Sequence, residues 1–111
     1  MNIEERTGDS AVIVSLDGRL DGTTAPDVEK QVSAIVDRGD VRIVLDCDRM
    51  SYVSSAGLRV LLLCARKCQQ GGGKLAIAGL QPECLSVLEM SGFHKIIECH
   101  ETSEAALAAV S

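Results

Sequence analysis

Aromatic residues are nearly absent from this sequence. Tyr52 and Phe93 are the only two among 111 residues, and there is no tryptophan. Domains that bind nucleic acids by stacking bases on aromatic rings are therefore disfavoured. A formal net charge of −5 also disfavours phosphate backbones and anionic lipids as ligands. We expect no direct binding to nucleic acid, and a core built from Leu, Ile, Val and Ala.

Long apolar runs are also lacking. None approaches the roughly 20 residues that a membrane-spanning helix needs, so we expect no membrane insertion. The beginning, Met1–Arg6, lacks the basic and apolar segments of a secretory signal. These absences predict a cytoplasmic protein. The chain length favours a single domain, residues 1–111, with one hydrophobic core.

The cysteines lack the spacing of a redox or metal motif. Their number, five, is odd, and no C-x-x-C pair occurs. In a reducing compartment we expect free thiols rather than disulfides. Cys64 and Cys68 lie four residues apart, but only His94 and His100 could add imidazole ligands. We therefore expect no metal site and no cofactor.

Short apolar segments alternate with amphipathic segments along the chain. Turn residues at Gly8–Asp9 separate the first two predicted strands. Thr24 should cap the first helix, with Pro26 in its first turn and Asp27 completing a capping box. The predicted strands are Ile3–Thr7, Ala11–Leu16, Val41–Leu45, Lys74–Ala78 and Phe93–Glu98.

Four helices separate or follow these strands. The first ends at Gly39, the second runs from about Ser55 to Gln70, and the third from Pro82 to Met90, before Gly92. The last is a short, Ala-rich helix capped by Thr102 or Ser103. This order predicts an α/β fold with a mostly parallel sheet, an antiparallel N-terminal strand pair and about four helices. Periodicity leaves open whether the helices cover one face of the sheet or both.

The most informative segment is Val41–Lys67, where a strand, a polar loop and an apolar helix follow one another. The loop ends in Ser54, Ser55, Ala56 and Gly57, which we call the hinge. Free N–H groups and the helix dipole favour negative charge there. Ligands and partners of open α/β sheets also bind beyond the carboxyl ends of strands. A hinge hydroxyl could cap the helix, which is worth about 1 kcal/mol. It could also accept a phosphate without refolding.

A helical projection divides the segment after the hinge into two faces. The face that should meet the core holds Leu58, Leu61, Leu62 and Ala65. On the opposite face an apolar leucine lies between long basic side chains. Charge-flanked apolar residues next to a hinge are consistent with a partner surface. The residues we expect to line it are Ala56, Arg59, Val60, Leu63 and Lys67.

Four segments resemble the STAS domains, and more narrowly the bacterial anti-sigma factor antagonists. Met50–Leu62, M-S-Y-V-S-S-A-G-L-R-V-L-L, resembles their signature loop and helix. Gly18–Ala25, G-R-L-D-G-T-T-A, is similar to the family's G-x-L-D-x-x-T-A. Gly71–Leu75 is similar to the glycine-rich entry to the next strand, and Val87–Ile97 to the closing pattern. The resemblance extends over nearly the whole chain in the right order.

The resemblance implies a regulatory binding protein rather than an enzyme. Such antagonists bind an anti-sigma factor that is also a serine kinase, and so release a sigma factor for transcription. The kinase phosphorylates a hinge hydroxyl, which ends binding, and a metal-dependent serine phosphatase restores it. We therefore expect partner switching between proteins, by a monomer or weak dimer.

The family's hinge usually reads D-S-[Ser/Thr]-G, whereas this hinge reads S-S-A-G. Ser54 replaces the acidic residue, and Ala56 removes a hydroxyl that some members phosphorylate. The resemblance therefore implies phosphorylation of Ser55, with Ser54 as the alternative. Asp21 matches an acidic residue near the hinge, and Thr24 matches a helix-cap position. Both are expected at the partner surface, although Asp21 could also simply order the turn before Thr24.

Two other functions remain as alternatives. The altered hinge is compatible with a constitutive STAS scaffold in another signalling or transport complex. An enzyme has less support, because no cysteine is followed six residues later by arginine, as phosphatase chemistry would require. In G-G-G-K-L, Lys74 is followed by Leu75 rather than the Ser or Thr of a phosphate-binding loop. His94 lies near Ser91, but no residue is predicted to orient the pair.

Overall fold

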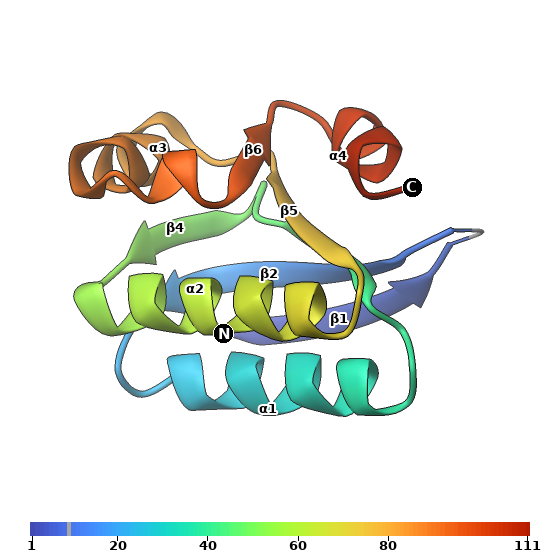
Figure 1. Ribbon diagram of the computed structural model, residues 1–111. Helices are drawn as coiled ribbons and strands as arrows, with labels where there is room; N and C mark the ends of the chain where they lie inside the picture. Colours follow the sequence, from blue (N-terminus) through green and yellow to red (C-terminus); the bar gives the residue numbers. More distant parts are fainter. Residues whose placement is uncertain (9) are drawn as a thin grey trace.

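The computed structural model describes residues 1–8 and 10–111, so the predicted turn at Gly8–Asp9 lies partly outside the described residues. Strands and helices alternate after an initial strand pair (Figure 1). The strands are β1 (Asn2–Thr7), β2 (Val12–Leu20), β3 (Arg42–Asp46), β4 (Met50–Val53), β5 (Lys74–Ala78) and β6 (Glu98–His100). The helices are α1 (Ala25–Asp37), α2 (Ser55–Gln70), α3 (Pro82–Ser91), the 3-10 turn η1 (Phe93–Lys95) and α4 (Ser103–Val110).

The sheet has the predicted topology. β1 and β2 are antiparallel, the other pairs are parallel, and the main path runs β1-β2-β3-β5-β6. β4 lies off this path and pairs with β2. The first half of β2 pairs with β3, and its last residues pair with β4 after a register shift at Gly18 and Arg19. The long strand β2 thus connects the main sheet to the segment that leads into the hinge.

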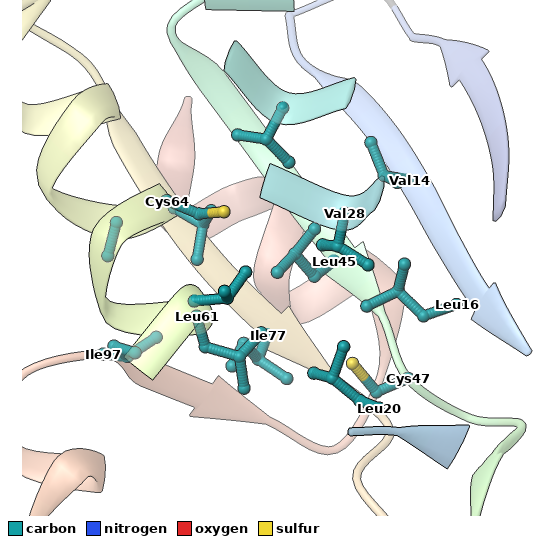
Figure 2. Close-up of a cluster of buried hydrophobic side chains, with 14 of the residues drawn as sticks. Val14, Leu16, Leu20, Val28, Leu45, Cys47, Leu61, Cys64, Ile77 and Ile97 are labelled. Atoms are coloured by element: carbon teal, nitrogen blue, oxygen red, sulfur yellow. The ribbon is translucent and has the colours of Figure 1, made fainter. Parts of the chain in front are cut away.

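Helices cover both faces of the sheet, which answers the question that periodicity left open. Neighbouring residues of β3 point to opposite sides: Leu45 belongs to the larger apolar cluster and Val44 to the smaller one. The larger cluster includes residues of α1, α2 and α3, and the smaller one lies under α4. Figure 2 shows part of the larger cluster, with Val28 of α1 and Leu61 of α2. Among the described residues, no helix has both the length and the hydropathy that crossing a membrane requires.

The prediction of a strand at Phe93–Glu98 is wrong. Gly92 ends α3 with φ +79°, and Phe93–Lys95 then form η1. The carbonyl of Phe93 accepts hydrogen bonds from the N–H groups of Ile96 and Ile97, at 2.9 Å each. Ile97 is buried, but the strand begins only at Glu98. The apolar run had the composition of a strand, but local hydrogen bonds turn the chain before β6 begins.

Candidate partner-binding site at the start of helix α2

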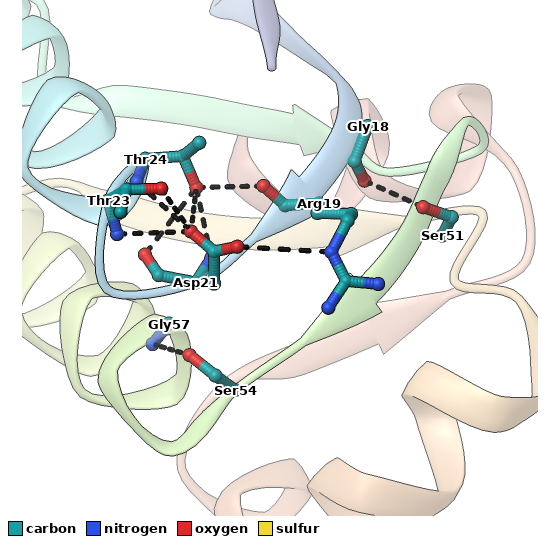
Figure 3. A network of polar contacts seen from close by, with 8 residues as sticks. All are labelled: Gly18, Arg19, Asp21, Thr23, Thr24, Ser51, Ser54 and Gly57. Atoms are coloured by element: carbon teal, nitrogen blue, oxygen red, sulfur yellow. Dashed lines mark hydrogen bonds and ion pairs between the residues drawn. The ribbon is translucent and has the colours of Figure 1, made fainter.

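Two loops meet at one edge of the sheet because the strands before them are parallel. Leu20, the last residue of β2, is opposite Val53, the last residue of β4. The loop of residues 21–24 therefore lies beside the hinge (Figure 3). The N–H of Ser54 donates to the carbonyl of Leu20 at 2.9 Å and ties the two segments together.

The hinge follows β4, a strand that the sequence analysis missed. The first and last residues of β4, Met50 and Val53, are buried, whereas Ser51 and Tyr52 between them are exposed. A segment of four residues with this pattern shows no alternation between apolar and polar residues, so its sequence predicts a loop rather than a strand. The hinge hydroxyls therefore lie beyond the carboxyl end of β4, not directly beyond the predicted strand Val41–Leu45.

The two hinge serines differ in their environment. Ser54 is the N-cap of α2: its Oγ accepts a hydrogen bond from the N–H of Gly57 at 3.1 Å. Its carbonyl accepts from the N–H of Leu58 at 2.9 Å. Ser55 is the first residue of the helix and is exposed, and its hydroxyl has no hydrogen-bond partner within the described residues. Capping therefore occupies the hydroxyl of Ser54 and leaves that of Ser55 accessible.

Gly57 is required where α2 approaches the end of β2. A Cβ atom at this position would lie 2.7 Å from the carbonyl oxygen of Leu20 and 2.9 Å from its Cγ. Val53 closes the space on the other side, at 3.1 Å. Only a residue without a side chain permits this contact, and it keeps the start of α2 close to the loop of residues 21–24.

Asp21 organises the loop that faces the hinge. One of its carboxylate oxygens accepts hydrogen bonds from Thr23, at 3.0 Å from the backbone N–H and 2.7 Å from the hydroxyl. These bonds lower the pKa of Asp21 below its ordinary value, because they stabilise the charged form. The second oxygen lies 3.9 Å from Nε of Arg19. Asp21 thus orders the turn and keeps a negative charge beside the hinge at neutral pH.

Thr24 does not form the predicted capping box. It occupies the N-cap position of α1, but its φ of −100° and ψ of −27° are helical and its side chain makes no cap hydrogen bond. Its hydroxyl instead accepts from the N–H of Asp21 at 2.9 Å and donates to the carbonyl of Arg19 at 2.7 Å. The hydroxyl of Thr24 is thus used for hydrogen bonds within the loop. It stabilises the loop and does not cap α1.

An exposed aromatic side chain lies beside this loop. The guanidinium of Arg19 stands 4.1 Å from the ring centroid of Tyr52, which is 41% exposed. Such cation–π pairs contribute about 0.5–1 kcal/mol at exposed sites. Neither Arg19 nor Tyr52 is among the predicted site residues. The available signal was that an aromatic residue, rare in this chain, occurs two residues before the hinge.

The outward face of α2 is narrower than the helical projection predicted. Val60, expected on this face, is only 7% exposed and packs in the larger cluster, so that prediction is wrong. Leu63, also expected to point outward, is half-buried, and so is Leu62, which was assigned to the core. The reason is that α2 packs against α1 as well as against the sheet, so two neighbours cover it from different sides. The exposed positions near the hinge are Ser55, Ala56 and Arg59, and Arg66 is exposed further along the helix.

The cysteines and surface hollows do not contribute to this site. All five cysteines are free, and burial raises the pKa of Cys64 to about 12 and that of Cys68 to about 11. Thiols of this kind stay protonated and are poor nucleophiles. The described residues contain no group of three or more His, Cys, Asp or Glu side chains that could hold a metal ion. A hollow of about 330 Å³ is lined by residues including Arg6, Asp46 and Arg49, none of which belongs to the hinge.

Proteins similar in sequence point to one family. The STAS domain family matches residues 1–106. A relative from Bordetella bronchiseptica, named "Putative anti-sigma factor antagonist BtrV", is 42% identical over 91% of this chain and 87% of its own length. The anti-sigma F factor antagonist of Paenibacillus polymyxa is 31% identical, over 96% of this chain and 92% of its own.

A solved structure supports the same fold. The Bacillus cell fate determinant SpoIIAA in its phosphorylated form has a TM-score of 0.74 and covers 97% of this chain and 98% of its own. At 21% identity, this likeness shows the fold alone. The family match over most of the chain, together with relatives above 30% identity across nearly all of it, establishes the family. This chain belongs to the STAS domain family, with relatives named as anti-sigma factor antagonists.

Proposed function

We propose that this protein is an anti-sigma factor antagonist that binds an anti-sigma factor with serine kinase activity and is released by phosphorylation of Ser55. One observation carries the assignment of the site. The hydroxyl of Ser55 is exposed at the first residue of α2 and has no hydrogen-bond partner in the described structure. The relatives named as antagonists support the class of partner. The expected place of action is the bacterial cytoplasm.

Ser55 is a better acceptor than Ser54 for a physical reason. The Oγ of Ser54 already accepts a hydrogen bond from the N–H of Gly57, and Ser54 is half-buried, so its hydroxyl is less accessible to a kinase than that of the exposed Ser55. Phosphorylation of Ser55 leaves that bond intact. A phosphate there would also lie at the positive end of the helix dipole, where negative charge is stabilised. The modification would therefore change the surface without unfolding the helix.

The proposed switch consists of two reactions, the phosphorylation of Ser55 and the hydrolysis of its phosphate. The kinase transfers the γ-phosphoryl group of its nucleoside triphosphate to Oγ of Ser55; the serine loses its proton and the diphosphate leaves. The serine phosphatase reverses this when water attacks phosphorus, which releases inorganic phosphate and restores the hydroxyl. Phosphorylation adds up to about two negative charges at pH 7. That charge, placed within the proposed contact area, would oppose binding of a partner that fits the neutral hydroxyl.

The proposed contact area consists of the hinge, the loop beside it and the outer face of α2. Asp21 supplies a fixed negative charge, and Thr24 holds the loop in place. Arg59 is exposed one turn after Ser55, whereas Leu63 and Lys67 are half-buried further along the helix. Val60 is not included because it is buried. The remaining members are the hinge residues Ser54, Ser55 and Ala56, whereas Gly57 is buried and instead lets α2 approach the end of β2.

The first experiment localises phosphate on the tryptic peptide Met50–Arg59 from protein isolated from its native host under several growth conditions. This peptide contains Ser51, Ser54 and Ser55. We expect a condition-dependent phosphate on Ser55. A phosphate on Ser54 would retain the switch but move its site.

A binding experiment separates the switch from a constitutive scaffold. The anti-sigma factor is captured from the native host and its affinity is measured with the Ser55→Asp and Ser55→Ala variants. We expect Ser55→Asp to weaken binding and Ser55→Ala to preserve it. Equal binding by both variants, together with no phosphate at good peptide coverage, would favour the scaffold. The observation in favour of the scaffold is that Ser54 replaces the Asp that is usual at this hinge position.

A further inference from the structure

The sequence segment that contains α2 carries charge of one sign only. Residues 49–82 contain no Asp or Glu, although the whole chain has a net charge of −5. Two of the five cations in this stretch have partners: Arg49 lies 4.0 Å from Asp17, and Lys74 forms an ion pair with Glu98. The three on α2 form no ion pair within the described residues. They are Arg59, Arg66 and Lys67.

One of these cations lies within reach of the proposed phosphorylation site. Ser55 and Arg59 are four residues apart on α2, so they lie on the same face one turn apart, and both are exposed. Side chains of a helix lean toward its N-terminus, so we expect the side chain of Arg59 to extend over the turn that contains Ser55. Arg66 lies about 16 Å further along the axis than Ser55, too far to contact it.

We propose that Arg59 is the phosphate-binding residue of the switch: it pairs with phosphorylated Ser55, and with an acidic side chain of the partner when Ser55 is unmodified. This inference rests on the proposed function. Guanidinium groups bind phosphate and carboxylate through paired, charge-assisted hydrogen bonds. Phosphorylation then acts twice, because it adds negative charge and also occupies the cation that the partner requires. The partner is accordingly a protein with an acidic residue opposite the first turn of α2.

The phosphate contact can be tested without the partner. Phosphoserine is incorporated at position 55 during translation, and the second pKa of its phosphate is measured by ³¹P NMR across pH 4–8. We expect Arg59→Gln to raise that pKa by about 0.3 unit or more, because the lost cation stabilised the dianion. Arg42→Gln removes an exposed cation outside α2 and should leave the pKa unchanged. Thermal unfolding of each variant verifies that it is folded.

Two outcomes of the titration would overturn the assignment. The first is an identical phosphate pKa in the wild type and Arg59→Gln. The second is a shift caused by Arg19→Gln and not by Arg59→Gln, which would give the role to the other cation beside the hinge. Because phosphoserine is incorporated during translation, this test does not depend on a kinase. Its failure would leave the proposed function intact, whereas a missing phosphate in the host would contradict the proposed function whatever the titration gives.

The partner contact is tested with unmodified protein and the anti-sigma factor captured above. Arg59→Gln should weaken binding about fivefold or more, since it leaves an acidic group of the partner without its cation. Arg42→Gln is the matched control and should bind like the wild type. Unchanged affinity of Arg59→Gln would refute the carboxylate contact.

Discussion

The hydrogen bond between Ser54 Oγ and the N–H of Gly57, 3.1 Å long, gives a measurable stability difference between two adjacent serines. Ser54→Ala removes the cap and leaves a backbone donor at the start of α2 without a protein partner. We expect a loss of about 1 kcal/mol in the free energy of unfolding. This corresponds to a urea midpoint lower by about 0.5 M, or a melting temperature lower by about 4 °C.

The neighbouring serine provides a matched control. Ser55→Ala removes the same atom from an exposed hydroxyl that has no hydrogen bond in the described structure, so its effect should stay within about 0.5 kcal/mol. Ser54→Asp should retain the wild-type stability, because aspartate caps helices well and its charge suits the helix dipole. Urea unfolding at pH 7 of all three variants is the assay. Equal stability of Ser54→Ala and Ser55→Ala would refute the assigned capping role.

Three further predictions concern packing and pH. Gly57→Ala should destabilise by about 1–3 kcal/mol in urea unfolding, because its Cβ would lie 2.7 Å from the carbonyl oxygen of Leu20; wild-type stability would show that α2 can move away. Leu61→Ala, at a position 0% exposed, should lower the free energy of unfolding by about 2–5 kcal/mol in the same measurement. A loss below about 1 kcal/mol would mean that neighbouring side chains move to fill the cavity. Burial raises the pKa of Cys64 to about 12 and of Cys68 to about 11, against about 8.5 in the unfolded chain. The unfolded state loses these protons first, so the urea midpoint should fall as pH rises from 8 to 11. A Cys64→Ala/Cys68→Ala variant should show a smaller fall.

The sequence was sufficient to predict the elements with strong local signals. The bounds Ser55–Gln70 of α2 and Lys74–Ala78 of β5 agree with the structure, because a long apolar periodicity and flanking glycines mark them. Gly92 ends α3 as predicted. The failures occurred where tertiary contacts outweigh local preference. β4 has only four residues and is defined by its pairing with β2, and Phe93–Lys95 form η1 despite a strand-like composition.

The site was predictable in its position but not in its details. The position of the hinge at a helix N-terminus follows from the sequence, but the sequence does not show which hydroxyl caps the helix. That depends on the extended backbone of Ser54, with ψ 175°. The burial of Val60 also required the structure, because a helical projection does not reveal that α2 has α1 on one side and the sheet on another. Likewise, the pairing of Arg19 with Tyr52 depends on the register of β2 against β4.

The two unequal apolar clusters imply an order of local opening. The smaller cluster holds α4 through Ala106 and Val110, whereas the helix that carries the hinge is anchored in the larger one through residues such as Leu61 and Cys64. Free energies of local opening follow the buried apolar contacts that each segment must break. Amide hydrogens of α4 should therefore exchange with solvent well before those of α2. The C-terminal helix can detach transiently while the hinge keeps its geometry, so a tag or fused domain after Ser111 should leave partner binding undisturbed.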